Sequence, residues 1–349
     1  TAALVTPDRG LARRVAAELR RWDIEIDDSA GESLDATTPG RFLRLIAAAV
    51  SSGFAPAPKP PLPKHPLAAA GQSPNALRSA TRLLERLVLR GPRPGAGIEG
   101  LRAALTGRKV EGDELDTVER LLNQIETVTE PLVAVFSNAT GMLGDFLHAH
   151  IATAENLATT DSEAGADRMW NGDAGEMLAQ FLAELREAAN LLPQVSTVSY
   201  GALLESLMAG ATVRPRYGRH PRLAILGLLE ARLQHANLLV LGGLNEGIWP
   251  PDPQPDPWLS RPMREAFGLP LPERRIGLTA HDFVQAFSAP DRVRPRADKT
   301  DGQPTVPSRW LTRLDAVLRG AGAEDVIYPQ ASQWRALRNK LNQPAQTIT

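Results

Sequence analysis

The sequence predicts an α/β protein in which a parallel sheet domain is interrupted by a large all-helical segment. Three observations predict it. A strand–helix–strand pattern opens the chain, helical periodicity dominates from about residue 67 to residue 210, and two apolar runs of strand character follow near residues 222 and 238. We therefore expect residues 1–36 and 212–330 to form one sheet domain and residues 37–211 to form an inserted helical domain.

The first 28 residues have the pattern of a strand–helix–strand unit. Ala2 to Val5 predict a short strand, and the sequence Thr6-Pro7-Asp8 then predicts a helix with Thr6 as its N-cap. Residues 24–28, "IEIDD", predict a second strand, as in a parallel sheet. Apolar residues recur between them at helical spacing and predict the buried face of the helix: Leu11, Val15, Leu19 and Trp22.

Proline and helical periodicity characterise the middle of the chain. Thr38-Pro39 predicts a helix start, and the prolines of residues 55–66 predict an extended connector because proline lacks an N–H donor. We expect no strand and no repeat of fixed period in the helical stretch that follows. Its segments with a three-to-four spacing are 74–90, 97–106, 113–128, 131–159, 173–192 and 199–209.

Signals for strands return after residue 220. "RLAIL" and "NLLVLGG" are nearly continuous apolar runs, which is typical of strands covered on both faces of a parallel sheet. Helices are predicted at Pro262–Phe267, Thr279–Phe287 and Ser308–Leu318. Residues 331–349 predict a C-terminal helix and linker.

Composition excludes several classes of site. The chain of 349 residues has a net charge of −1 and no cysteine, so disulfides, thiolate metal sites and cysteine nucleophiles are excluded. It contains no run of 18 apolar residues and no positively charged start followed by an apolar block, so we expect no transmembrane helix, no signal peptide and a cytoplasmic protein. His148 and His150 stand two apart on a predicted helix and face different sides, so we expect no metal site.

Basic residues gather in two loops. One of them, with His220, predicts contacts to nucleic-acid phosphates, although a solvated loop is the more common meaning of such a run. Its arginines are Arg214, Arg216, Arg219 and Arg222. The second loop contains Arg292, Arg294, Arg296 and Lys299.

Residues 238–251, "LLVLGGLNEGIWPP", begin as a strand and end in an unusual loop. Functional loops of parallel sheets leave the carboxyl ends of strands. The glycines let the backbone turn and approach a neighbour closely, and Trp249 against Pro250 would lock the loop. Glu246 would then present a carboxylate to a sugar hydroxyl, an arginine or a backbone amide. The alternative is a strand-end turn with the glutamate in solvent.

The order of these segments resembles a known family. "GGLNEGIWP" is similar to the fifth conserved motif of superfamily 1 helicases of the UvrD/RecB kind, and "LVTPDRGLARRVAAELRRWDIEIDDSAG" resembles their fourth motif region. Residues 220–283 and the stretch "VPSRWLTRLDAVL" resemble the AddB family, the second subunits of bacterial AddAB helicase–nucleases. The resemblance implies a second RecA-like (2A-like) domain with a 2B-like helical insertion, as an interior piece of a longer protein.

The resemblance also implies which residues would meet a nucleotide. Glu246 belongs to the fifth motif, and Arg296 best matches the arginine that reaches the γ-phosphate in active helicases. The strand before Arg296 is poor in apolar residues, and Thr6 stands near a position where relatives carry arginine, so a lapsed nucleotide site is expected. The chain contains neither a P-loop nor a nuclease metal motif. We expect no catalytic residue, metal or cofactor here, although a parent protein would bind ATP and Mg²⁺.

Three functions follow as hypotheses. In the first, the chain is part of a subunit that processes double-strand DNA breaks for recombinational repair, and it acts with an AddA-type partner as a DNA-scanning scaffold. The second is one half of an active ATP-dependent helicase, completed by another domain. The third is a two-domain α/β transferase that uses "GGLNEG" as a sugar-nucleotide loop.

Overall fold

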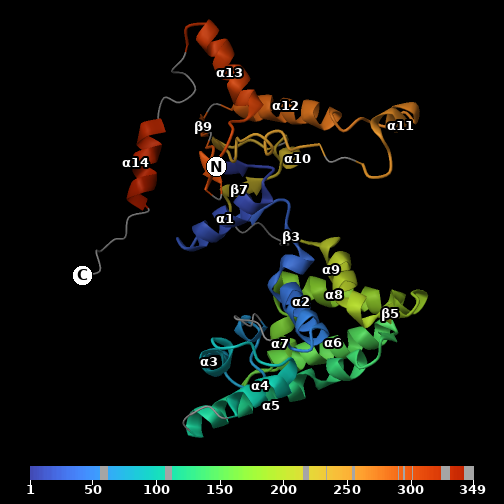
Figure 1. Ribbon diagram of the computed structural model, residues 1–349. Coiled ribbons are helices and arrows are strands. Elements are labelled where there is room, and N and C mark those ends of the chain that lie inside the picture. The colour runs from blue at the N-terminus through green and yellow to red at the C-terminus, as the bar shows by residue number, and fades with distance from the viewer. Residues whose placement is uncertain are drawn as a thin grey trace. The chain divides into compact units, whose positions relative to one another are not determined.

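The computed structural model shows a mixed α/β protein whose chain forms two compact units (Figure 1). Unit 1 comprises residues 1–30 and 217–349, and unit 2 comprises residues 31–216. Each unit has its own cluster of buried apolar side chains. The structure describes residues 1–55, 62–106, 112–214, 220–232, 234–253, 256–289, 291–293, 295–300, 302–323 and 331–341.

Unit 1 contains a five-stranded sheet in which every strand pair is parallel. Its order is β2-β7-β1-β8-β9, so the predicted parallel sheet is confirmed. The central strand comes from the first five residues, and Leu4 lies opposite Ile225 on one side and Val240 on the other. The strands are β1 (Ala2–Val5), β2 (Asp27–Asp28), β7 (Leu223–Leu226), β8 (Leu238–Leu241) and β9 (Asp291–Val293).

Helices cover the sheet of unit 1. Val5 belongs to the buried cluster that includes Phe283 of α12, whereas Leu4 lies on the face that carries Leu11 of α1. The helices are α1 (Arg9–Arg20), α10 (Leu228–Ala231), α11 (Arg261–Ala266), α12 (Arg274–Phe287), α13 (Arg309–Gly320) and α14 (Ala331–Leu341). A two-stranded ribbon pairs β10 (Lys299–Thr300) with β11 (Gln303–Pro304).

The opening segment of unit 1 differs from its prediction in three places. The N-cap of α1 is Asp8, not Thr6, because the Asp8 carboxylate accepts the Leu11 N–H at 3.0 Å. A carboxylate also interacts favourably with the positive end of a helix. Trp22 lies beyond the end of α1 and is 63% exposed, so it is not part of the buried face. β2 contains only the last two of the five predicted residues.

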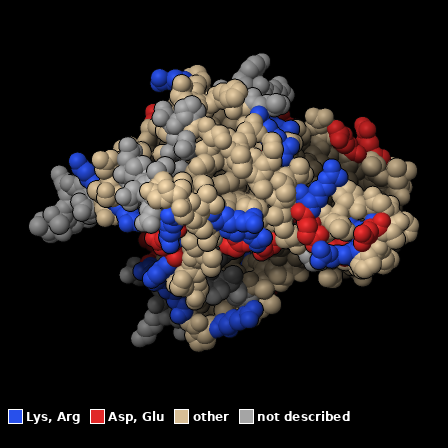
Figure 2. Space-filling view, turned by 90° about the horizontal axis from the view of Figure 1, so that it is seen from above, with Lys and Arg blue, Asp and Glu red and all other residues tan. Residues whose placement is uncertain are grey.

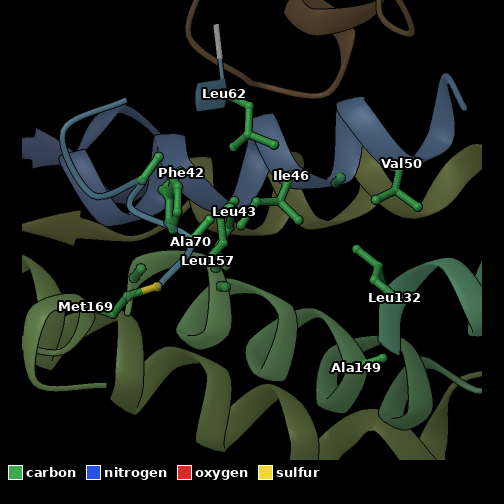
Figure 3. Packing of buried hydrophobic residues seen from close by; sticks show 14 of the residues in the cluster. Phe42, Leu43, Ile46, Val50, Leu62, Ala70, Leu132, Ala149, Leu157 and Met169 are labelled. Atoms are coloured by element: carbon green, nitrogen blue, oxygen red, sulfur yellow. The ribbon is translucent and has the colours of Figure 1, made fainter. Parts of the chain in front are cut away.

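Unit 2 is built mainly of helices. α2 begins after the N-cap Thr37, with Pro39 in its first turn, and four of its apolar side chains are buried against other helices: Phe42, Leu43, Ile46 and Val50 (Figure 3). The helices are α2 (Thr38–Ser51), α3 (Pro74–Leu84), α4 (Gly97–Leu105), α5 (Gly112–Phe136), α6 (Leu143–Ala158), α7 (Gly165–Met169), α8 (Gly172–Ala188) and α9 (Thr197–Ala209). Shorter helical turns are η1 (Leu34–Ala36), η2 (Leu62–Lys64), the π-helical η3 (Glu85–Leu89) and η4 (Ala189–Leu191).

The helical unit differs from its prediction at the ends of some elements. Antiparallel pairs join β3 (Glu32–Ser33) to β6 (Thr212–Val213) and β4 (Thr140–Gly141) to β5 (Val195–Ser196). The expectation of no strand between residues 67 and 210 is therefore wrong for β4 and β5, since two residues are too few to show a strand period. Of the connector 55–66, residues 56–61 lie outside the described part, and η2 follows.

α5 continues through a proline that was predicted to divide two helices. It contains Pro131 and ends at Phe136, so the interruption falls near residue 140. Proline disturbs the hydrogen-bond ladder of a helix. The next backbone N–H, of Leu132, donates to the side-chain oxygen of Thr153 in α6 at 3.2 Å. The proline is thus accommodated by a hydrogen bond to the neighbouring helix.

His150 is buried inside unit 2. Its Nε2 donates to the backbone oxygen of Leu43 at 3.0 Å, because a carbonyl oxygen can only accept. Its Nδ1 therefore accepts from the Tyr200 hydroxyl at 2.9 Å. Burial lowers the pKa of His150 to about 4, so the ring is neutral at pH 7. His148, two residues earlier, is exposed.

Candidate functional site

The candidate site lies where the parallel strands of unit 1 end. Because these strands run in the same direction, the residues that follow them meet at one edge of the sheet, which we call the carboxyl edge. Residues 6–8 follow β1, residues 242–250 follow β8 and residues 295–298 follow β9. The predicted nucleotide-binding residues Glu246 and Arg296 therefore both lie at this edge.

Two glycines of the loop 242–250 have backbone conformations that favour glycine. A Cβ atom at Gly242 would lie 2.8 Å from Leu4 Cδ1, so a larger residue there would displace the end of the Leu4 side chain, whereas Gly243 has a φ of +74°. Gly247 has a φ of +82°, which favours glycine. Trp249 is fully buried, and its Nε1 donates to the Gly242 oxygen at 3.0 Å. The indole closes the loop on itself and packs edge-on to Phe283 in α12.

A buried asparagine joins the loop to the segment after β9. The Asn245 Nδ2 donates to the Ala297 oxygen at 2.8 Å and to Thr305 Oγ1 at 2.9 Å. Its Oδ1 accepts the Ala297 N–H at 3.0 Å. Asn245 was not singled out in the sequence, where its only signal is an amide side chain within an apolar, glycine-rich run.

The Glu246 carboxylate is bound at the start of α13. It accepts the Arg309 backbone N–H at 3.0 Å and Arg309 Nε at 2.7 Å, and it also contacts Nη2 of the same side chain. The Arg309 side chain, opposed in part by desolvation, lowers the pKa of Glu246. Ser308 beside it is buried, accepts the Trp310 N–H at 3.3 Å as N-cap of α13, and donates to the Trp249 oxygen. These contacts fasten α13 to the loop.

Three arginines described at the carboxyl edge each face a carboxylate. Arg296 Nη1 lies 3.0 Å from Asp298 Oδ1, and Arg9 pairs with Asp28 at the end of β2. With Arg309 paired to Glu246, the positive charge of these three arginines is balanced within the chain. A phosphate bound here would have to compete with these carboxylates for the same guanidinium groups.

Of the predicted DNA-binding arginines, Arg222 is the one that the structure describes within unit 1, and it is not at this edge. Arg222 directly precedes β7, so it lies at the opposite, amino edge of the sheet, where it is exposed. Arg214 follows β6 in unit 2 and is also exposed. Arg216 and Arg219 lie outside the described residues. On the face shown in Figure 2, Lys and Arg side chains lie in several groups with Asp and Glu among them.

The described residues contain neither a candidate metal site nor a candidate membrane-spanning helix. In that part of the chain, no group of three or more His, Cys, Asp or Glu side chains is placed to hold a metal ion. Over the same residues, no helix combines the length and the apolar character needed to cross a membrane.

Comparison with known proteins adds no assignment to this site. Neither a protein-family model nor a curated protein matches the chain. The contacts described above and the resemblance in its motifs are therefore the grounds on which a function can be proposed.

Proposed function

We propose that this chain is part of an AddB-like helicase–nuclease subunit that processes double-strand DNA breaks, where it acts as a DNA-binding scaffold and not as a motor. In this proposal, the sheet of unit 1 is a RecA-like domain and unit 2 is its 2B-like insertion. Its partners are DNA and an AddA-type subunit in the cytoplasm. ATP and Mg²⁺ would be handled elsewhere in the assembly.

One observation carries the proposal of a scaffold. Glu246 and Arg296, the two side chains that would meet a nucleotide, are each engaged in an ion pair within the chain. The Glu246 pair also includes the backbone N–H that begins α13, so its carboxylate has a structural partner in place of a ribose or a water. A motor would need such groups free to rearrange around a changing phosphate.

The topology supports the RecA-like part of the proposal. All of the strand pairs in the sheet are parallel, and β1 lies between β7 and β8, which follow it by more than 200 residues. Unit 2 occupies the intervening sequence. In this proposal unit 2 is an insertion, and the strands before and after it are free to pair with each other.

Binding and hydrolysis measurements on the whole chain test the proposal. We expect fluorescence anisotropy to detect salt-sensitive binding of a labelled single-stranded oligonucleotide, because phosphate contacts release counterions. We expect no ATP hydrolysis that DNA stimulates. DNA-stimulated hydrolysis would favour the helicase alternative. Binding of a sugar nucleotide without any binding of DNA would favour the transferase.

A set of substitutions tests which arginines hold the DNA. Replacing Arg214, Arg216, Arg219 and Arg222 together by alanine should weaken binding and reduce the slope of log K against log salt by about 0.7 for each phosphate that the variant no longer neutralises. The matched control replaces four exposed arginines elsewhere, Arg14, Arg82, Arg186 and Arg313. Equal weakening in both variants would show that the effect is one of net charge, not of this loop.

A further inference from the structure

A projecting arm of unit 1 carries large apolar side chains in solvent. The arm, residues 256–278, contains α11 and the start of α12, and Figure 1 shows α11 at the end of α12 that points away from the sheet. Trp258 is 86% exposed and Phe267 is 72% exposed. Met263 and Leu269 are also exposed, at 45% and 40%. Exposed apolar side chains gathered in one segment indicate a binding surface.

The arm is held in shape by its own polar contacts. Asp256 accepts the backbone N–H groups of Trp258 and Leu259 at 2.9 and 3.1 Å, and these bonds lower its pKa, with Arg264 adding to the effect. Arg264 Nη1 donates to Asp256 at 2.6 Å, while its Nε and Nη2 donate to the Pro270 oxygen at 3.1 and 3.0 Å. Arg264 thus ties both ends of the α11 segment together. The aromatic side chains are presented by an ordered scaffold.

The charges of the arm favour a polyanion. Asp256 is paired with Arg264, and Glu273 is paired with Arg261. Arg274 and Arg275, in the first turn of α12, are exposed and form no ion pair with any residue that the structure describes. Glu265 is an exposed acid of the arm, so the four arginines outnumber the three acids.

We propose that this arm binds single-stranded nucleic acid, with Trp258 and Phe267 stacking on bases and with Arg274 and Arg275 contacting phosphates. Exposed aromatic rings and unpaired cations in one segment are the combination that binds single strands without regard to sequence. A purely apolar protein partner would leave those arginines without a complement. The inference rests on the proposed function, which it extends by naming the surface that meets the strand.

Alanine substitutions of the aromatic residues test the arm directly. In the whole chain, the Trp258→Ala/Phe267→Ala variant should bind a labelled oligothymidylate at least about 25-fold more weakly than the wild type, because loss of stacking on each of two bases weakens binding by about fivefold or more. The matched control is Trp22→Ala/Trp334→Ala, which removes two exposed tryptophans outside the arm. Trp258→Phe should retain most of the affinity, since a phenyl ring still stacks. Circular dichroism checks that each variant is folded.

The outcomes separate this inference from the proposed function. If the wild type binds the oligonucleotide and the arm variant binds it equally well, the arm is not the site, although the DNA-binding role stands. If the wild type does not bind, both proposals fail. An equal loss of affinity in the control pair would overturn the proposed role of the arm. A wild-type dimer, seen by light scattering, that becomes monomeric in the arm variant would also overturn it, because the surface would then join two copies of the chain.

Discussion

At the scale of the residue, His150 shows how burial determines the chemistry of a side chain. The ring is fully buried, and its two nitrogens are held by Leu43 and Tyr200, neither of which offers a carboxylate that could balance a protonated ring. His65 is similar. Burial, together with the charge of Arg41, lowers its pKa to about 4. Both rings are neutral in the folded chain at pH values where an exposed histidine is charged.

Acid should therefore destabilise unit 2. The folded pKa of about 4 lies below the ordinary 6.5, so between these values the unfolded chain binds more protons and a falling pH favours unfolding. We expect each histidine to remove about 2 kcal/mol from the free energy of unfolding between pH 7 and pH 5. Urea titrations at several pH values measure this loss.

Variants assign the effect to the buried ring. His150→Gln should reduce the slope of stability against pH, whereas His148→Gln, at an exposed position, should leave it unchanged. An NMR titration of the wild type gives a second measurement, in which the His150 ring stays neutral down to about pH 4. Titration of His150 near pH 6.5 would contradict the assignment.

Single residues were the hardest part of the structure to predict. The glycines and Trp249 of the loop 242–250 could be recognised as a special turn, because few sequences combine these residue types. The ion pair of Glu246 with Arg309 joins residues 63 apart, and no local pattern indicates it. The cap of α1 was missed because Thr6 and Asp8 are both good N-caps. Only the folded path of the backbone selects Asp8.

At the scale of the element, α5 shows how a helix keeps an internal proline. The Leu132 N–H donates to Thr153 in α6, and both residues are fully buried. Periodicity predicted the helical character of this stretch correctly but ended the helix at the proline. The acceptor that lets α5 continue lies 21 residues away, so the sequence around Pro131 does not contain it.

Removing that acceptor should destabilise the pair of helices. Thr153→Val keeps the side-chain shape but removes the side-chain acceptor of the buried Leu132 N–H, and we expect a loss of about 1–3 kcal/mol in the free energy of unfolding. Thr153→Ser restores a hydroxyl and should recover most of the loss. Urea unfolding measures both. Thr127→Val, at an exposed position of α5, is the control, and a loss as large as that of Thr153→Val would contradict this account.

At the scale of the whole molecule, the two buried clusters share no residue. The cluster of unit 2 draws on residues 34–213, and that of unit 1 draws on residues 3–5 and 226–311. The mixed α/β class and the parallel sheet could be predicted because strand and helix periods differ and the apolar runs are long. The pairing of β1 with β7 and β8 joins distant parts of the sequence, which the motif order predicted and periodicity alone did not.

The separate clusters predict which part of the chain folds alone. Residues 31–216, expressed by themselves, should show a helical circular dichroism spectrum and a cooperative urea transition, since they contain all of the buried cluster of unit 2. Residues 217–349 should show no such transition, because β7 and β8 lack the strand that lies between them. A gradual, non-cooperative transition of 31–216 would contradict the division.

The central strand β1 is synthesised long before the two strands that flank it. On the ribosome this strand emerges more than 200 residues before either of its neighbours. At about 5–20 residues per second, translation leaves it unpaired for roughly ten seconds or longer. During that interval the intervening helices can already collapse around their own core, so β1 would pair with β7 and β8 only after unit 2 has begun to fold.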